Sequence, residues 1–300
     1  MVKVSVVIPT YNRGQSIQQA VDSALDQTID SIEVIVVDDG STDNTPDVME
    51  KYNNEPKVSY IQHEHNYNGS VARNTGINVA KGQYIAFLDS DDVWECYKIE
   101  RQLALISAES SAGAYCDVKR NRRKITSLLY RIVPDRTATP YDGNSDMARK
   151  ILKRELDFGG CSTLIIKKDI LDKIDGFDEG FERHQDIEFI IRVLEHGKVS
   201  FVNEELVLRS GWSTPNAELL KSEKKKLLTK YSELIIDMDM ENENPIGKHK
   251  FNLATVYFKE GKFIEGARLL SKSSFAKPKS RELLSLGFHI FTGILKTLRS

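Results

Sequence analysis

The first hundred residues alternate between short apolar runs rich in β-branched residues and stretches whose apolar residues have helical spacing. The apolar runs cover residues 4–8, 32–37, 58–61 and 84–88, and the helical stretches between them cover 17–25, 45–49 and 71–79. Strands that are separated by helices usually run parallel, and a parallel sheet is buried by helices on both faces. The alternation therefore predicts an α/β domain with a mostly parallel sheet and helices on both of its faces.

Polar residues stand where three of these predicted strands end. They are Thr10 and Tyr11 after the first strand, Asp38 and Asp39 after the second, and Asp89 and Asp91 after the fourth. Because the carboxyl ends of parallel strands share one edge, where ligands of open α/β sheets bind, we expect these residues to form one site. The fingerprint G-x-G-x-x-G is missing after the first strand, which argues against a dinucleotide-dependent dehydrogenase.

The turn Asp89-Ser90-Asp91-Asp92 carries three carboxylates in four residues. Carboxylate oxygens suit hard cations, and Mg²⁺ usually binds one or two carboxylates together with substrate phosphates. We therefore expect a divalent metal, Mn²⁺ or Mg²⁺, and a phosphate at this turn. Taken by itself, such a turn would more often be an acidic segment that merely ends a strand.

Composition predicts a cytoplasmic protein with a full hydrophobic core. The chain has 300 residues, of which 40% are hydrophobic, and this length suggests roughly two domains. It contains no apolar run of eighteen residues, and the first apolar run reaches Pro9 too early for a signal peptide. The three cysteines lack metal-ligand spacing, so we expect reduced, buried thiols.

The C-terminal part of the chain differs from the rest in charge. Residues 245–300 hold eleven Lys or Arg and three Asp or Glu, a net charge of +8, which leaves −10 for residues 1–244. The spacing from Leu253 to Pro278 resembles one tetratricopeptide-like hairpin, although a plain helical hairpin explains it as well. Residues 281–299 follow with a broad apolar face and basic ends. Such a helix could lie on an anionic membrane or complete the core of the hairpin.

Five segments of the chain, taken in order, resemble the motifs of family 2 inverting glycosyltransferases. They are residues 4–12 (VSVVIPTYN), 36–43 (VVDDGSTD), 72–74 (ARN), 87–92 (FLDSDD) and 186–189 (DIEF). The resemblance covers about residues 1–212 and implies a GT-A type fold. We therefore expect a catalytic domain over 1–214, with a nucleotide-sugar half (1–110) and an acceptor half (111–214), and a helical region over 215–300.

The resemblance also implies roles for individual residues. Thr10, Tyr11 and Asp39 would contact the nucleoside, Asp89 the ribose, and Asp91 the metal that bridges the two phosphates. Arg73 would bind the base or a phosphate, since a guanidinium can form two parallel hydrogen bonds; a salt bridge on the surface of a helix is an equal alternative.

Asp186 is the candidate general base, which would take the proton of the attacking acceptor hydroxyl. Its position at the start of a predicted helix also suits a simple helix cap. The chain departs from the family here, because Gln185 replaces the usual Glu before this Asp. No His follows in the segment 209–213 (RSGWS), where many relatives have a further metal contact.

The expected activity is that of a hexosyltransferase in glycan biosynthesis, which includes cell-surface polysaccharide and protein glycosylation. One sugar would move with inversion from a nucleotide-diphosphate sugar, with UDP favoured, to a glycan or a polyprenyl-phosphate-linked acceptor. The Q-x-x-R-W signature of processive synthases is missing. No nucleic-acid partner is expected, whereas peripheral contact with the cytoplasmic face of a membrane and homo-oligomerisation stay open. The alternatives are a sugar nucleotidyltransferase, whose Gly-rich loop is missing at residues 9–13, and an inactive nucleotide-sugar-binding scaffold.

Overall fold

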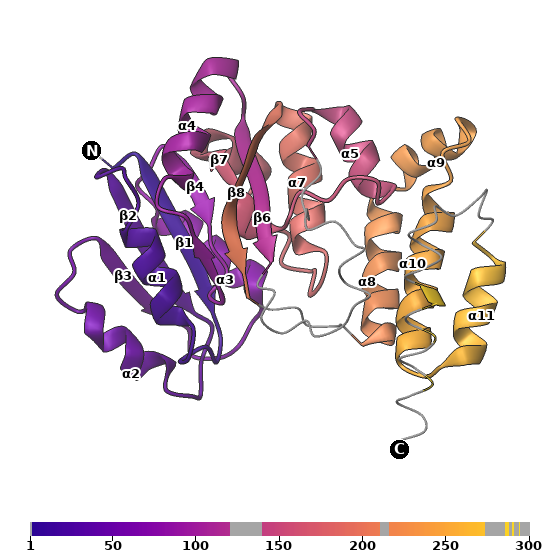
Figure 1. Ribbon diagram of the computed structural model, residues 1–300, viewed down its shortest axis with the longest axis horizontal. Coiled ribbons are helices and arrows are strands. Elements are labelled where there is room, and N and C mark those ends of the chain that lie inside the picture. The colour runs from indigo at the N-terminus through magenta and orange to yellow at the C-terminus, as the bar shows by residue number, and fades with distance from the viewer. Residues whose placement is uncertain are drawn as a thin grey trace. The chain divides into compact units, whose positions relative to one another are not determined.

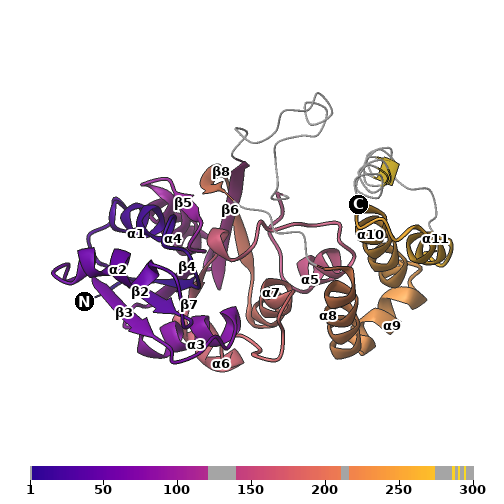
Figure 2. The same cartoon turned by 90° about the horizontal axis from the view of Figure 1, so that it is seen from below.

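The structure is a computed structural model that describes residues 2–120, 140–210 and 216–273, together with residues 286, 287, 290 and 294. The chain divides into two compact units (Figures 1 and 2). The first consists of Met1–Ala148 and Leu156–Trp212, and the second of Arg149–Glu155 and Ser213–Ser300. Two segments lie outside the described residues: residues 121–124 of the basic stretch 119–124 (KRNRRK), and most of the predicted C-terminal helix at 281–299.

One sheet forms the centre of the first unit. Its described strands follow the order β3-β2-β1-β4-β7-β6-β8-β5. Their bounds are β1 (Val4–Thr10), β2 (Ile32–Asp38), β3 (Val58–Gln62), β4 (Tyr84–Phe87), β5 (Asp92–Trp94), β6 (Gly113–Arg120), β7 (Ile165–Lys167) and β8 (Val199–Arg209). Of the seven neighbouring pairs, β3-β2, β2-β1, β1-β4 and β6-β8 are parallel, and the other three are antiparallel. The predicted α/β class with a mostly parallel sheet is confirmed.

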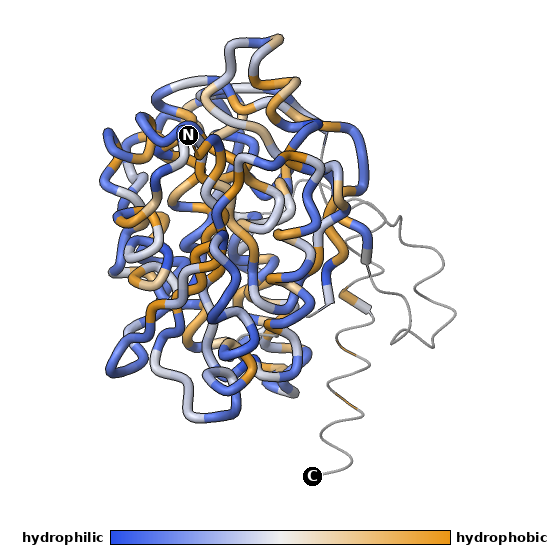
Figure 3. Tube along the Cα trace, turned by 90° about the vertical axis from the view of Figure 1, so that its left-hand side faces the viewer, coloured by the Kyte–Doolittle hydropathy of each residue, from blue (hydrophilic) through white to orange (hydrophobic). Residues whose placement is uncertain are grey.

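Helices cover both faces of the parallel half. The helices of the first unit are α1 (Ile17–Leu25), α2 (Thr45–Met49), α3 (Gly69–Val79), α4 (Lys98–Glu109), α6 (Lys168–Ile174) and α7 (Gln185–His196), with 3-10 turns at Glu50–Tyr52 and Cys161–Thr163. Val6 packs in one cluster with residues of α1 and α4, whereas its neighbour Val7 meets Gly76 of α3 on the other face. Successive strand residues point to opposite faces, which accounts for this division. Hydrophobic residues accordingly run through the strands in Figure 3.

The antiparallel strand β7 separates β4 from β6. Ile165 pairs with Ala86 of β4 on one side and with Ala114 of β6 on the other. This insertion ends the all-parallel half of the sheet immediately beside the acidic turn that follows β4. The segment that leads into β7 therefore reaches the carboxyl ends of the parallel strands.

The second unit is helical in its described residues. It contains α8 (Ala217–Lys230), α9 (Ser232–Met240), α10 (Pro245–Lys259) and α11 (Phe263–Ser271), and α5 (Ser145–Leu152) contributes its end. Leu220, Leu253 and Tyr257 share a buried cluster. The α10-α11 hairpin is close because α11 has Gly266 at the contact, where a Cβ would lie 2.8 Å from the Phe258 ring. No helix in the described residues is long and apolar enough to cross a membrane.

Candidate functional site

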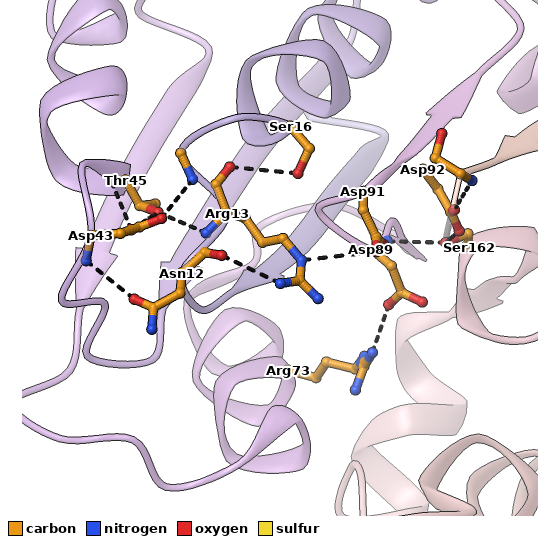
Figure 4. Close-up of polar contacts among 12 residues, drawn as sticks. Asn12, Arg13, Ser16, Asp43, Thr45, Arg73, Asp89, Asp91, Asp92 and Ser162 are labelled. Carbon is orange, nitrogen blue, oxygen red and sulfur yellow. Dashed lines mark hydrogen bonds and ion pairs between the residues drawn. The ribbon is translucent and has the colours of Figure 1, made fainter. Parts of the chain in front are cut away.

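The loops after β1 and β2 are joined into one rim. Thr10 and Asp38 are paired at the ends of the two strands. Beyond them, Asn12 has a φ of 52°, and its Oδ1 accepts hydrogen bonds from the backbone N–H groups of Thr42 (2.8 Å) and Asp43 (3.2 Å). Asn tolerates this left-handed conformation better than most residues. The asparagine thus fixes the loop that carries Tyr11 against the loop that carries Asp39 (Figure 4).

The three predicted nucleoside contacts differ in how they are held. Asp39 is buried, and its Oδ1 accepts hydrogen bonds from His63 Nδ1 (2.8 Å) and from the backbone N–H of Tyr67 (3.1 Å). Its Oδ2 has no protein partner among the described residues. Thr10 Oγ1 is buried and has no hydrogen-bond partner among the described residues either, and Tyr11 is 41% exposed. A free carboxylate oxygen, a free hydroxyl and an exposed ring are suitable groups for binding a nucleoside.

Asp38 has a structural task, although it lies beside Asp39. Its Oδ1 accepts a hydrogen bond from the backbone N–H of Ser41 (2.8 Å), and its Oδ2 accepts one from the Tyr60 hydroxyl (2.5 Å). Both oxygens are therefore occupied within the protein. Asp38 closes the turn and leaves Asp39 as the acid that can meet a ligand.

The acidic turn after β4 is held by Ser162, which lies in the 3-10 turn before β7. Ser162 Oγ accepts a hydrogen bond from the backbone N–H of Asp89 (3.0 Å) and donates one to Asp92 Oδ2 (2.7 Å). Asp92 is buried, and this burial, together with the charge of Asp89, raises its pKa to about 7. The Asp91 side chain is 36% exposed, and its contact is Arg13 at 3.8 Å. Asp92 therefore supports the turn, and Asp91 presents its carboxylate outward (Figure 4).

Arg73 joins the acidic turn to the start of α7. Its Nη2 donates to Asp89 Oδ1 (2.7 Å), and its Nη1 donates to Gln185 Oε1 (3.1 Å). The guanidinium is nearly buried and lies 5.4 Å from the centre of the Phe177 ring. The Arg73 guanidinium thus binds both Asp89, the predicted ribose contact, and Gln185, which precedes the predicted general base Asp186. Gln185 supplies a neutral acceptor, so the positive charge of Arg73 is paired with Asp89.

Asp186 is the second residue of α7, as expected for an acid at the start of a helix. Its Oδ1 accepts a hydrogen bond from the backbone N–H of Ile187 (2.9 Å). Burial raises the pKa of this carboxyl, and the charge of Arg209 acts in the opposite direction. A carboxyl whose pKa is raised toward neutrality is better suited to accept a proton.

Arg209 approaches Asp186 because Gly160, the second of the adjacent glycines Gly159 and Gly160, leaves room for its side chain. A Cβ on Gly160 would lie 3.1 Å from Arg209 Nη2 and 3.7 Å from Asp186 Oδ2, so both side chains approach the same point. Gly160 has a φ of 84°, a conformation that other residues rarely adopt. Sequence reasoning missed Arg209, Ser162 and His63. The glycine pair was the available signal for the first two, since it marks a close backbone approach.

The oxygen ligands of the site fit a metal that is held mainly by a substrate. Among the described residues, no three His, Cys, Asp or Glu side chains are grouped so as to hold a metal ion. Asp91 nevertheless offers a partly exposed carboxylate at the turn, and its ion pair with Arg13 is long. Mg²⁺ is typically bound by one or two carboxylates plus substrate phosphates rather than by a complete protein cage.

Comparison with known proteins agrees with this geometry. The family model for glycosyl transferase family 2 matches residues 5–175. The putative teichuronic acid biosynthesis glycosyltransferase TuaG of Bacillus subtilis is 41% identical over 113 residues, which cover 37% of this chain and 45% of that protein. The E. coli enzyme WfaP, named as a UDP-Glc:alpha-D-GlcNAc-diphosphoundecaprenol beta-1,3-glucosyltransferase, is 40% identical over 112 residues, 37% of this chain and 44% of that protein.

The matches to curated relatives span about half of the relatives' own length. Among solved structures, S. aureus TarS 1-349 with UDP-GlcNAc has a TM-score of 0.60 at 17% identity, covering 96% of this chain and 91% of that one. The mannosyltransferase PcManGT of Pyrobaculum calidifontis, with GDP-Man and Mn²⁺, has a TM-score of 0.62 at 15% identity, covering 99% and 87%. These structures confirm the expected GT-A fold. With the family model matching more than half of its residues, the chain belongs to glycosyl transferase family 2.

Proposed function

We propose that this protein transfers one sugar, with inversion at its anomeric carbon, from a UDP-sugar to a lipid-linked glycan acceptor. The observation that carries the proposal is the double contact of Arg73, which connects Asp89 of the acidic turn to Gln185 beside Asp186. A site of this kind brings the donor's diphosphate and the acceptor's hydroxyl to one place. The names of relatives support the two substrates: WfaP acts with UDP-Glc on a GlcNAc-diphosphoundecaprenol, and TarS binds UDP-GlcNAc.

Thr10, Tyr11 and Asp39 would bind the nucleoside in this proposal. The free Oδ2 of Asp39 accepts a hydrogen bond from a base N–H, and the exposed ring of Tyr11 lies along the base. The buried Thr10 hydroxyl gains a hydrogen-bond partner, which it lacks among the residues that the structure describes. Asp89 faces the ribose while Arg73 keeps its carboxylate in place.

Asp186 would act as the general base. It takes the proton of the acceptor hydroxyl as that oxygen forms its bond to C1, and the bond from C1 to the diphosphate oxygen breaks on the opposite face. A single displacement of this kind inverts C1. The raised pKa of Asp186 favours proton uptake, and the nearby positive charge of Arg209 keeps the carboxylate available before the reaction.

Asp91 would hold a divalent cation together with the diphosphate. When bound, the cation neutralises negative charge that builds up on the leaving nucleoside diphosphate. Asp92 and Ser162 keep the turn in shape, so that the Asp91 carboxylate stays directed outward. A lipid-linked acceptor also implies that the protein works at the cytoplasmic face of a membrane.

The proposal is tested by thermal stabilisation with nucleotide sugars. UDP-, GDP- and dTDP-sugars are each added with and without Mn²⁺. At a ligand concentration of about 100 times Kd, stabilisation is about 2.7 kcal/mol, or about 5 to 10 °C for a domain of this size. We expect a UDP-sugar with Mn²⁺ to give this shift, and Asp91→Asn to abolish its metal-dependent part.

The exposed Asp30 provides the matched control, because Asp30→Asn removes the same charge away from the acidic turn. A full metal-dependent shift in Asp91→Asn would contradict the assigned metal position. Transfer is then measured on a lipid-linked GlcNAc acceptor, and NMR gives the configuration of the new bond. Tight donor binding without any transfer would favour an inactive scaffold, and retention of configuration would refute the single displacement.

A further inference from the structure

The helical unit contains a pocket formed by α8, α9 and α10, with a volume of about 420 Å³. Four lysines line it, three from α8 and one from α10. They are Lys221, Lys224, Lys225 and Lys250. Asp239 is the one carboxylate on the lining, which therefore has a clear excess of positive charge. An excess of this kind favours an anionic ligand.

Most of this charge has no acidic partner among the residues that the structure describes. Lys221 pairs with Glu218 at 3.5 Å, and both side chains are largely exposed. Lys225 and Lys250 make no ion pair with any described residue. Solvated lysines on a helix surface are common, so the other lining groups decide what this pocket can bind.

Lys224 is the most informative group, because it is only 3% exposed. Its Nζ lies 3.2 Å from His249 Nδ1, and His249 Nε2 lies 2.8 Å from the carbonyl oxygen of Leu152. A carbonyl can only accept, so Nε2 carries the hydrogen and Nδ1 accepts from Lys224. The buried ammonium therefore has a neutral partner. Burial, followed by the charge of Arg154, lowers its pKa well below the ordinary value, and a bound anion would relieve this cost.

Beside these charged groups and the polar Thr229, Ser232 and His249, the lining is apolar. Leu228, Ile235, Ile246 and Leu253 contribute to it, and Ile236 stands at the pocket with 58% of its surface exposed. Met240, one turn further along α9, is 78% exposed. Two large apolar side chains at positions i and i+4 form an exposed ridge on one side of the helix. An inorganic anion would gain nothing from contact with this apolar ridge, whereas the hydrocarbon chain of an amphiphile could pack on it.

We propose that this pocket binds a lipid phosphate, with its phosphate at Lys224, Lys225 and Lys250 and its hydrocarbon chain over Ile236 and Met240. The chemistry is that of an anionic head and an apolar tail, which matches a basic pocket with an apolar floor. That such a lipid carries the acceptor glycan rests on the proposed function. The binding itself does not, since it requires neither donor nor metal.

Calorimetric titration of the full-length protein with farnesyl phosphate tests this proposal. Farnesol and inorganic phosphate are titrated separately, to measure the tail and the head alone. We expect saturable binding of farnesyl phosphate, and binding of either part at least tenfold weaker. In Lys225→Gln/Lys250→Gln, each lost charge costs about fivefold in affinity, so farnesyl phosphate should bind about 25-fold more weakly.

Lys272→Gln is the matched control, because Lys272 is exposed at the end of α11 and does not line the pocket. It should bind farnesyl phosphate within twofold of the wild type. Ile236→Ser should weaken farnesyl phosphate about fivefold or more and leave inorganic phosphate unchanged. Circular dichroism checks that each variant is folded.

Equal affinity in the wild type and in the double variant would overturn the proposal. So would farnesol, or inorganic phosphate, binding as tightly as farnesyl phosphate. The same protein samples are assayed for hydrolysis of the UDP-sugar donor. Normal hydrolysis without lipid binding overturns only this inference, whereas lipid binding without donor turnover counts only against the proposed function.

Discussion

Lys98 offers a quantitative test of the packing behind the acidic turn. Its side chain is fully buried in α4, its Nζ donates to Gln102 Oε1 (2.7 Å), and the ammonium lies 3.9 Å from the centre of the Trp94 ring. Trp94 in turn donates from Nε1 to the carbonyl oxygen of Ser162 (2.8 Å), the residue that holds the turn. Burial lowers the pKa of Lys98 from 10.5 to about 8.

The size of the effect follows from this pKa. One pKa unit corresponds to about 1.4 kcal/mol, so the shift corresponds to about 3 kcal/mol between the charged and the neutral amine. The unfolded chain binds the proton more tightly than the folded protein does. Stability due to Lys98 therefore rises with pH between about 8 and 10.5.

Lys98→Met removes this titration. The unfolding free energy of the variant minus that of the wild type should therefore fall by about 3 kcal/mol from pH 7.5 to pH 10.5. Urea unfolding at several pH values measures it, with Trp94 fluorescence as the signal in a Trp212→Phe background. Lys81→Met, at an exposed site, should give a difference that does not vary with pH. A constant difference for Lys98→Met would show that water reaches its ammonium, and would refute the reasoning.

Three further predictions concern the site itself. Thr10→Val should weaken donor binding about fivefold to tenfold, the worth of one hydrogen bond, without lowering the Tm of the free protein, because Thr10 Oγ1 has no hydrogen-bond partner in the described part of the chain. Calorimetry and thermal unfolding check this, and a lower Tm with unchanged donor affinity would contradict it. Asp186→Asn should slow sugar transfer by a factor of about 10² to 10⁴, while its donor affinity stays within twofold of the wild type. Single-turnover assays measure the transfer rate, and an unchanged rate would mean that the carboxylate only caps α7. Asp92, whose pKa burial raises to about 7, holds a proton in the folded state that the unfolded chain has released, so its contribution to stability is lost as pH rises from about 4 to 7. As pH rises from about 4 to 7, the unfolding free energy of Asp92→Asn should increase relative to that of the wild type, measured in EDTA-containing buffer. The same pH dependence in both proteins would contradict the raised pKa of Asp92.

The parallel half of the sheet could be predicted because its signals are local. The strand at Val4–Thr10 is a continuous apolar run, and α1 repeats its apolar residues at helical spacing. The strand β6 (Gly113–Arg120) has no clear strand signal in the sequence, because its glycine and its Asp117 interrupt any apolar run. Pairing with β8, about 85 residues later in the chain, makes it a strand. Such long-range pairing leaves no trace in a short window of sequence.

The helices α8 and α9 fall within the region 215–300 that was predicted to be helical, but their bounds could not be predicted. Their lysines and glutamates are spaced so that Leu220 and Leu227 are buried on one side, which is a weak signal in so charged a segment. In the site, motif residues identified the candidates, but not their partners. The bond from Arg73 to Gln185 joins residues 112 positions apart, and neither residue indicates the other in the sequence.

The two hydrogen bonds of Arg73, to Asp89 and to Gln185, also have an evolutionary consequence. A substitution of Asp89 that suits another donor removes the carboxylate that pairs with Arg73. Because Arg73 also donates to Gln185, the change affects the residue next to Asp186, the proposed general base. Paired substitutions at these positions should therefore be non-additive, as expected for residues in one hydrogen-bond network. If Asp89 and Asp186 have the roles proposed above, donor preference and acceptor preference are coupled through the guanidinium of Arg73.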